Sequence, residues 1–174
     1  MNTKKLVHLA MLTSVGLALH IMEGMIPNPF AMVAPGAKIG LANTIGLITL
    51  VIYGFKYAVT VNLLRCFIAG IASGAITSMM YSMAGALIST SLMWFGYKAF
   101  KRYFSLVGVS VLGALGHNVA QLTVAAFIIN NIKIYTYLPI MMLASILTGI
   151  FIGITVNFTI GKAKVHLKNS IDMI

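Results

Sequence analysis

The chain has 174 residues, of which 60% are hydrophobic and 8% are charged, and its mean hydropathy is +0.99. Soluble globular domains carry about 25% charged residues, so this composition excludes a soluble globular domain and predicts an integral membrane protein. The net charge of +10 lies mostly between apolar runs, as in loops that fix membrane topology, and we therefore exclude nucleic acid as a partner.

Six apolar segments follow one another along the chain and are expected to be helices that cross a bilayer. A hydrocarbon core about 30 Å thick requires about 20 apolar residues per helix. The segments cover residues 6–26, 39–53, 57–73, 76–97, 104–129 and 138–160. The first segment resembles a secretory signal, but further spans follow, so we expect a retained signal-anchor helix. The second segment is short and would be tilted or partly re-entrant. The prediction is a single all-α transmembrane domain over residues 1–174 with six helices.

The positions of the cations predict the orientation of this bundle. Cytoplasmic loops carry an excess of Lys and Arg. With both termini in the cytoplasm, the inner cations are Lys4, Lys5, Lys56, Lys98, Lys101, Arg102, Lys162, Lys164 and Lys168. Lys38 and Lys133 would lie outside, and Arg65 lies within a helix. We therefore expect a multi-pass protein of the cell membrane with cytoplasmic N- and C-termini.

Arg65 is the most informative residue, because a charged side chain inside a bilayer is costly and usually faces a cavity or a partner. It lies about 12 Å into its segment at 1.5 Å per residue, near the midplane, with Asn62 on the same face. Its planar guanidinium could bind an anionic group of a ligand. It could also pair with Glu23, the only carboxylate in the apolar segments. The sequence leaves both interpretations open.

Other polar side chains are expected in the middle or outer half of the bundle. His20 shares a face with Glu23, but these two residues have no third ligand at a diagnostic spacing, so we predict no metal site and no cofactor. The candidate substrate-binding residues are Arg65, Asn118, Gln121, His117, Glu23, Lys38, Asn43, Asn62 and Tyr81. Interhelical hydrogen bonds could also explain each of them. However, a scatter of structural polar residues would not favour one leaflet, so we expect a pocket that opens outward.

Small residues recur at four-residue spacing in three segments, which allows helix backbones to approach closely in lipid. They are Ala10, Ser14 and Ala18 in the first segment, Gly70 and Gly74 in the third, and Gly149 and Gly153 in the sixth. Each set could serve internal packing. For the first segment, the alternative is a docking surface for a partner membrane protein.

The absence of two motifs limits the chemistry expected of the chain. Gly161-Lys162 lacks both the earlier glycine and the following Ser or Thr of an ATP-binding phosphate loop. A single carboxylate in the apolar segments also excludes paired-carboxylate catalysis and a magnesium–diphosphate cluster. We therefore do not expect an enzyme.

Several stretches resemble one family. They are Pro35-Gly-Ala-Lys-Ile-Gly-Leu-Ala-Asn43, Leu64-Arg65, Tyr81-Ser-Met-Ala-Gly85, and Ser105-Leu-Val-Gly-Val-Ser through Gly116-His-Asn118. Together they resemble the Gx transporter family, also named heptaprenyl diphosphate synthase component I, over nearly the whole chain. That family is similar to the S components of energy-coupling factor (ECF) transporters. These are six-helix membrane proteins that bind vitamins or similar molecules from outside, while a separate transmembrane scaffold and two ATPases supply the drive. The resemblance implies that Ala10, Ser14 and Ala18 contact the scaffold, although Ser14 departs from the common all-alanine form.

Three functions remain after this comparison of motifs. The favoured one is a transport subunit that captures a small molecule, which could be anionic, from outside, driven by a partner ATPase module or an ion gradient. Arg65 and Lys38 would contact negative charge, while other polar side chains orient the ligand. The alternatives are a membrane accessory subunit of a heptaprenyl diphosphate synthase, and a scaffold for other membrane proteins that binds no ligand.

Overall fold

The computed structural model describes residues 3–25, 40–74, 76–100 and 103–171, with side chains up to Lys162. Its helices are α1 (Thr3–Met25), α2 (Asn43–Tyr53), α3 (Phe55–Ser73), α4 (Ile76–Ala99), α5 (Leu106–Ile129), the 3₁₀ helix η1 (Ile132–Tyr137) and α6 (Leu138–Ile171). No strand occurs within these described ranges. The all-α prediction is therefore confirmed for this part of the chain.

Two helix boundaries differ by more than three residues from those predicted from the sequence. The expected helix at 39–53 begins only at Asn43, because Gly40 has a φ of +86° and starts a turn in which its carbonyl accepts a hydrogen bond from the Asn43 N–H. A left-handed residue of this kind cannot continue a right-handed helix. The last helix continues past the expected end at Ile160 to Ile171. No proline follows Ile160 to break it.

The helices make this a multi-pass membrane protein. Four helical stretches are long and apolar enough to cross a membrane, namely α1, α3, α5 and the continuous stretch Ile132–Lys162. The 24 residues of α4 also have the length. By contrast, the 11 residues of α2 extend about 16 Å, about half of the hydrocarbon thickness. The short α2 fits the partly re-entrant alternative, and six full crossings remain a prediction.

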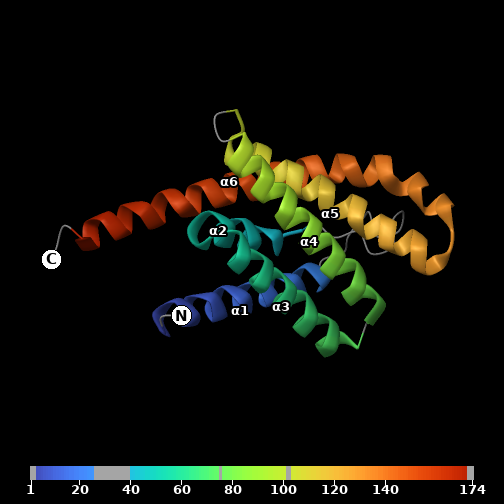
Figure 1. The fold of residues 1–174 in the computed structure, drawn as a ribbon, viewed down its shortest axis with the longest axis horizontal. Coiled ribbons are helices and arrows are strands. Elements are labelled where there is room, and N and C mark those ends of the chain that lie inside the picture. The colour runs from blue at the N-terminus through green and yellow to red at the C-terminus, as the bar shows by residue number, and fades with distance from the viewer. Residues whose placement is uncertain (1–2, 26–39, 75, 101–102, 172–174) are drawn as a thin grey trace.

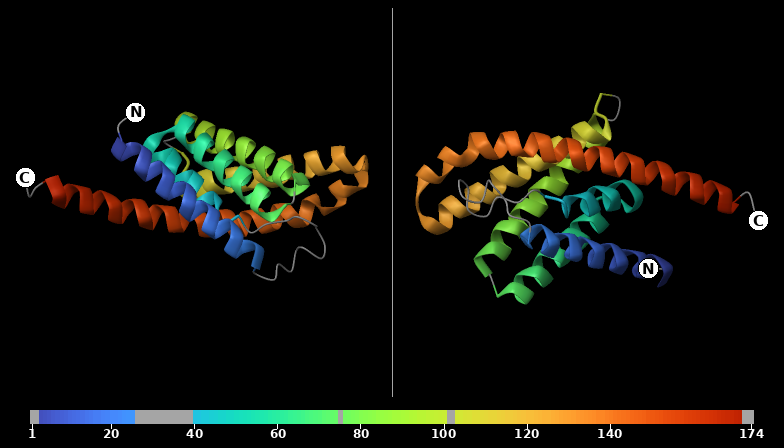
Figure 2. Two further views of the ribbon diagram at one scale, coloured as in Figure 1. Left: turned by 90° about the horizontal axis from the view of Figure 1, so that it is seen from below. Right: turned by 180° about the vertical axis from the view of Figure 1, so that it is seen from behind.

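The short helix α2 lies inside the bundle. All its residues from Asn43 to Leu50 are buried, and it contacts α1, α3, α4 and α6. Helix α4 packs against α3 and α5, and α5 packs against α6. Figures 1 and 2 show that α1 begins and α6 ends at the same end of the molecule, and that the end of α6 extends beyond the other helices.

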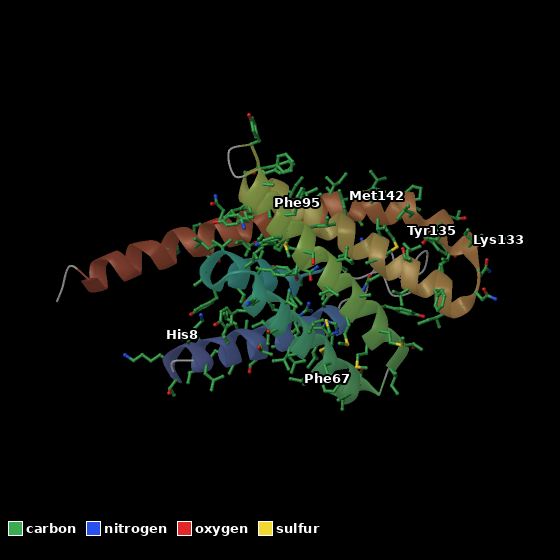
Figure 3. All side chains as sticks on the ribbon, in the orientation of Figure 1. His8, Phe67, Phe95, Lys133, Tyr135 and Met142 are labelled. Carbon is green, nitrogen blue, oxygen red and sulfur yellow. The ribbon has the colours of Figure 1, made fainter. Side chains whose placement is uncertain are left out.

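The distribution of side chains is that of a protein surrounded by lipid. Large apolar side chains such as Phe67, Phe95 and Met142 lie on the outside, as Figure 3 shows. Polar side chains such as Thr49 and Asn62 are completely or almost completely buried. This arrangement leaves the polar groups to interact with one another or with a ligand inside the bundle.

Candidate functional site

Arg65 of α3 is the centre of a polar cluster inside the bundle. It is only 3% exposed. Its Nη1 lies 3.2 Å from Nδ1 of His20, and its Nη2 donates to Oδ1 of Asn62 at 3.4 Å and to Oδ1 of Asn43 at 3.5 Å. Arginine can only donate, so Nδ1 of His20 accepts here. These bonds are at or beyond the usual 2.7–3.2 Å range, and the buried Nε of Arg65 has no partner.

Glu23 of α1 is also buried, with 5% of its surface exposed. Its Oε1 accepts a hydrogen bond from the backbone N–H of Gly40. The left-handed conformation of Gly40 is therefore part of the site, because it presents this N–H to the carboxylate. The guanidinium of Arg65 bonds to His20, Asn43 and Asn62.

Residues from five helices and the turn before α2 line a small cavity around this cluster, which we call the polar cavity. Its lining residues are His20, Glu23, Gly40, Ala42, Asn43, Arg65, Cys66, Ser82 and His117. The space is sufficient for about one water molecule. The polar cavity therefore brings together one buried cation, one buried carboxylate and two imidazoles.

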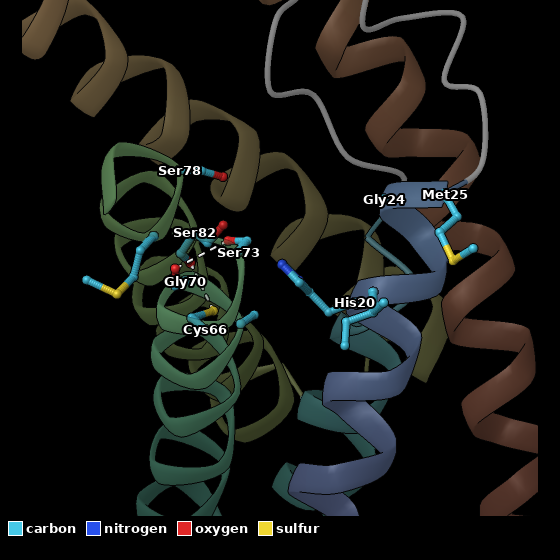
Figure 4. A pocket seen from close by; sticks show the side chains of 11 residues that line it. His20, Gly24, Met25, Cys66, Gly70, Ser73, Ser78 and Ser82 are labelled. Atoms are coloured by element: carbon cyan, nitrogen blue, oxygen red, sulfur yellow. Dashed lines mark hydrogen bonds between the residues drawn. The ribbon is translucent and has the colours of Figure 1, made fainter. Parts of the chain in front are cut away.

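A larger pocket of about 400 Å³, which we call the vestibule, adjoins the polar cavity between α1, α3 and α4. The two spaces share His20, Cys66 and Ser82 as lining residues. Figure 4 shows His20 reaching from α1 toward α3 and α4, and Met25, another lining residue of the vestibule, near the end of α1. Ligand pockets usually measure about 300–1,000 Å³, so the vestibule could hold a small molecule whose polar end lies near the shared residues.

The walls of the vestibule are mostly apolar or small. Met79 of α4 packs against Gly70 of α3, where an added Cβ would lie 2.5 Å from the methionine side chain. Gly70 is therefore needed for the close approach of α3 and α4 at this wall. The Sγ of Cys66 donates to the carbonyl of Ser82 at 3.5 Å and connects the same two helices.

The structure brings together five of the predicted site residues. Arg65, Glu23, Asn43 and His117 line the polar cavity, and Asn62 lies behind Arg65, where its Nδ2 donates to Oγ1 of Thr90 at 2.9 Å. The candidate set omitted His20 and Ser82. A signal for His20 was present, because it shares a helical face with Glu23. Ser82 had no such signal beyond its place beside Tyr81.

Other predicted residues lie elsewhere. Nδ2 of Asn118 donates to Oγ of Ser145 at 2.6 Å and to the Met141 carbonyl at 3.1 Å, so Asn118 connects α5 to α6. Gln121 is buried against Gly85 of α4 and lines neither the polar cavity nor the vestibule. Tyr81 is half-buried and lines neither of them. Lys38 lies outside the described residues.

The small residues predicted for docking on α1 lie on its outer face. Ala10, Ser14 and Ala18 are all exposed, whereas α1 buries Leu9, Thr13, Gly16 and Glu23 against the bundle. The Oγ of Ser14 bonds to the Ala10 carbonyl of its own helix. This stripe therefore does not serve packing within the described chain.

No curated protein and no solved structure matches the chain. Among the described residues, no group of three or more His, Cys, Asp or Glu side chains could hold a metal ion. A family profile matches residues 12–159, which include Arg65 and all the other described residues that line the polar cavity. The chain belongs to the family described as heptaprenyl diphosphate synthase component I, which confirms the resemblance found in its sequence.

Proposed function

We propose that this protein is the substrate-binding subunit of a membrane transporter, similar to an ECF S component. It captures a small molecule with an anionic group through the vestibule, and a partner ATPase module drives the uptake. The observation that carries this proposal is Arg65, a buried cation with an unpartnered Nε and long hydrogen bonds to neutral side chains.

An anionic ligand would complete the coordination of this guanidinium. Nearly all buried polar groups in proteins have hydrogen-bond partners, and an exception requires an explanation. A carboxylate or a phosphate oxygen pair can accept two parallel N–H bonds from arginine. Such a ligand could use the unpartnered Nε of Arg65 together with one terminal nitrogen. These bonds would contribute strongly to the binding free energy of the ligand, because charge-assisted hydrogen bonds are about twice as strong as neutral ones.

The charges of the polar cavity favour a ligand with few charges. Arg65 and Glu23 both line this cavity, so their formal charges cancel among its described residues. A diphosphate would place several negative charges close to one guanidinium and one carboxylate, and burying unpaired charge is expensive. This balance supports a small, singly charged molecule over a prenyl diphosphate.

Two further features support a partner-driven transporter. The vestibule lies near the end of the bundle where α1 ends and α4 begins, which is the outer end under the topology expected from the lysines. The exposed stripe of Ala10, Ser14 and Ala18 leaves a close-contact surface available on α1. A transmembrane scaffold with ATPase subunits is the partner that we propose for it.

Replacement of Arg65 tests the proposal directly. Native mass spectrometry of the purified wild-type protein is expected to detect a retained small molecule, which Arg65→Gln should lose. Lys133→Gln, at the far end of the molecule in Figure 3, is the matched control and should retain it. Equal retention by the wild-type and Arg65→Gln proteins, with both folded by circular dichroism, would remove Arg65 from the site. Absence of a ligand from wild-type protein would contradict the proposal as a whole.

The description of the family favours one second candidate, a membrane accessory subunit of a heptaprenyl diphosphate synthase. This function predicts association with a soluble, Asp-rich synthase subunit. Co-purification with such a subunit, together with product formation that depends on this chain, would support the accessory function over transport.

A further inference from the structure

A separate hollow of about 350 Å³ lies where α2 turns into α3 and α4 ends, and we call it the interfacial hollow. Its lining residues are Leu50, Val51, Gly54, Phe55, Trp94, Tyr97 and Lys98. None of these residues lines the polar cavity or the vestibule. The interfacial hollow is therefore independent of the proposed substrate site.

The turn between α2 and α3 keeps this hollow open. Gly54 has a φ of +89° and its N–H donates to the Leu50 carbonyl at 3.0 Å, so the chain reverses within one residue. A Cβ at Gly54 would meet no atom within 4 Å, which shows that the space beside the turn is empty. Beside it, the rings of Phe55 and Trp94 pack together, with 5.1 Å between their centroids. Two aromatic side chains thus form a wall of the hollow.

Aromatic and cationic side chains of several helices meet at this level of the bundle. The Nζ of Lys5 from α1 lies 3.6 Å from the ring centroid of Tyr57 in the first turn of α3. The Nζ of Lys98 from α4 lies 5.2 Å from the ring centroid of Trp94. Trp and Tyr concentrate where membrane helices pass the lipid headgroups. The interfacial hollow therefore lies at headgroup depth, on the side that carries Lys5 and Lys98.

We propose that the interfacial hollow binds one anionic phospholipid. The ammonium of Lys98 contacts the phosphate, and the upper part of an acyl chain lies against Trp94, Phe55 and Val51. Leu50, which is 3% exposed, forms an apolar base that a soluble anion would not use. Anionic lipids attract lysines at the membrane surface, and the combination of a cation with aromatic walls matches both parts of such a lipid. The bound lipid would occupy the angle between the α2–α3 turn and the end of α4.

The test compares lipid retention by the full chain and by two lysine variants. Protein in detergent is incubated with equal amounts of phosphatidylglycerol and phosphatidylcholine and examined by native mass spectrometry. Wild-type protein is expected to retain phosphatidylglycerol preferentially. Lys98→Gln should reduce this preference about fivefold, the effect of about one lysine near an anionic surface. Lys133→Gln, which is also exposed but lies at the opposite end, should leave it unchanged.

Each other outcome would overturn the proposal. An unchanged preference in Lys98→Gln would exclude Lys98 as the phosphate contact, and an equal loss in Lys133→Gln would indicate general charge attraction. A second variant, Trp94→Leu, tests the aromatic wall and should lower retention of both lipids. Displacement of the lipid by millimolar inorganic phosphate would assign the site to a soluble anion, and displacement by an acidic partner protein would assign it to that protein.

Discussion

Two stripes of small residues at the same four-residue spacing have opposite positions in the molecule. Gly149 and Gly153 of α6 are buried against α5, where a Cβ at Gly149 would lie 2.6 Å from Cα of Val111. An added Cβ at Gly153 would lie even closer to Cα of Val107. Ala10, Ser14 and Ala18 of α1 are exposed instead. The same spacing therefore occurs both where two helices of this chain meet and on a face that no other described helix covers.

The difference extends to the helices that carry the stripes. At the contact between α5 and α6, the glycines let the two helix backbones approach closely. The hydrogen bonds of Asn118 stabilise the same contact. Among the described helices, α1 packs mainly against α2 and α3, and 17% of the residues in its most apolar stretch are buried. One region of the molecule is closed by its own packing, while α1 keeps an exposed face, which we propose as the docking surface for another protein.

The largest expected effect comes from enlarging a buried glycine. Gly149→Leu should destabilise the protein by about 1–3 kcal/mol or more, because the side chain overlaps the α5 backbone. Ala18→Leu adds a similar bulk to the exposed stripe and should change stability by less than about 0.5 kcal/mol. Thermal unfolding in detergent measures both. Equal destabilisation of the two variants would end the distinction between the stripes.

A smaller effect is expected on partner binding. Ser14→Leu should reduce co-purification of a transmembrane partner about tenfold, equivalent to about 1.4 kcal/mol, because the branched side chain prevents close helix contact. The stability of the isolated protein should not change. Val15→Leu is the matched control, since Val15 is exposed on α1 outside the stripe. Loss of partner binding in both variants would show that the whole outer face of α1, rather than the stripe, makes the contact.

Asn118→Ala should sharpen the contrast between the closed contact and the site. It removes the bonds to Ser145 and Met141, and interhelical hydrogen bonds in membranes contribute about 0.6 kcal/mol on average and about 1.7 kcal/mol at most. We expect lower thermal stability with unchanged retention of the small molecule. Ligand loss at full stability would move Asn118 into the binding site.

The smallest effect is expected at the beginning of α1. Lys5→Gln removes the cation above Tyr57 and should cost about 0.5–1 kcal/mol, the range for an exposed cation–π contact. His8, whose Nδ1 lies 3.0 Å from the hydroxyl of Tyr53, would still connect α1 to α2. Unfolding of Lys5→Gln and Lys133→Gln, compared at two salt concentrations, separates the local contact from net charge. A larger loss would mean that α1 depends mainly on its first turn.

The sequence predicts the helices and the central arginine because both follow from the bilayer. Apolar length and Lys asymmetry are local properties, and a charge such as Arg65 must face the inside of the bundle wherever the helices lie. The predicted start of α2 was wrong because the helix begins only after Gly40, and the presence of a glycine in the sequence does not determine its backbone conformation.

The remaining differences concern how the helices are rotated. His117 and Asn118 are neighbours in sequence, yet His117 lines the polar cavity and Asn118 contacts α6. Successive residues of a helix point about 100° apart, so only the packing of α5 between α4 and α6 assigns each side chain to its neighbour. His20 shares a helical face with Glu23, but unlike Glu23 it carries no formal charge that would single it out as a site residue.

The helix α6 is longer than the hydrocarbon layer of a membrane is thick. Its 34 residues extend about 51 Å, and even a tilt of about 40°, the upper end of the range for membrane helices, leaves about 39 Å along the bilayer normal. The hydrocarbon layer accounts for about 30 Å of this, so part of the helix must extend into the headgroup region. A fluorescent protein or a crystallisation chaperone joined in helical register to Ile171 would be held at a fixed distance from the membrane surface, without a change to the polar cavity, the vestibule or the interfacial hollow.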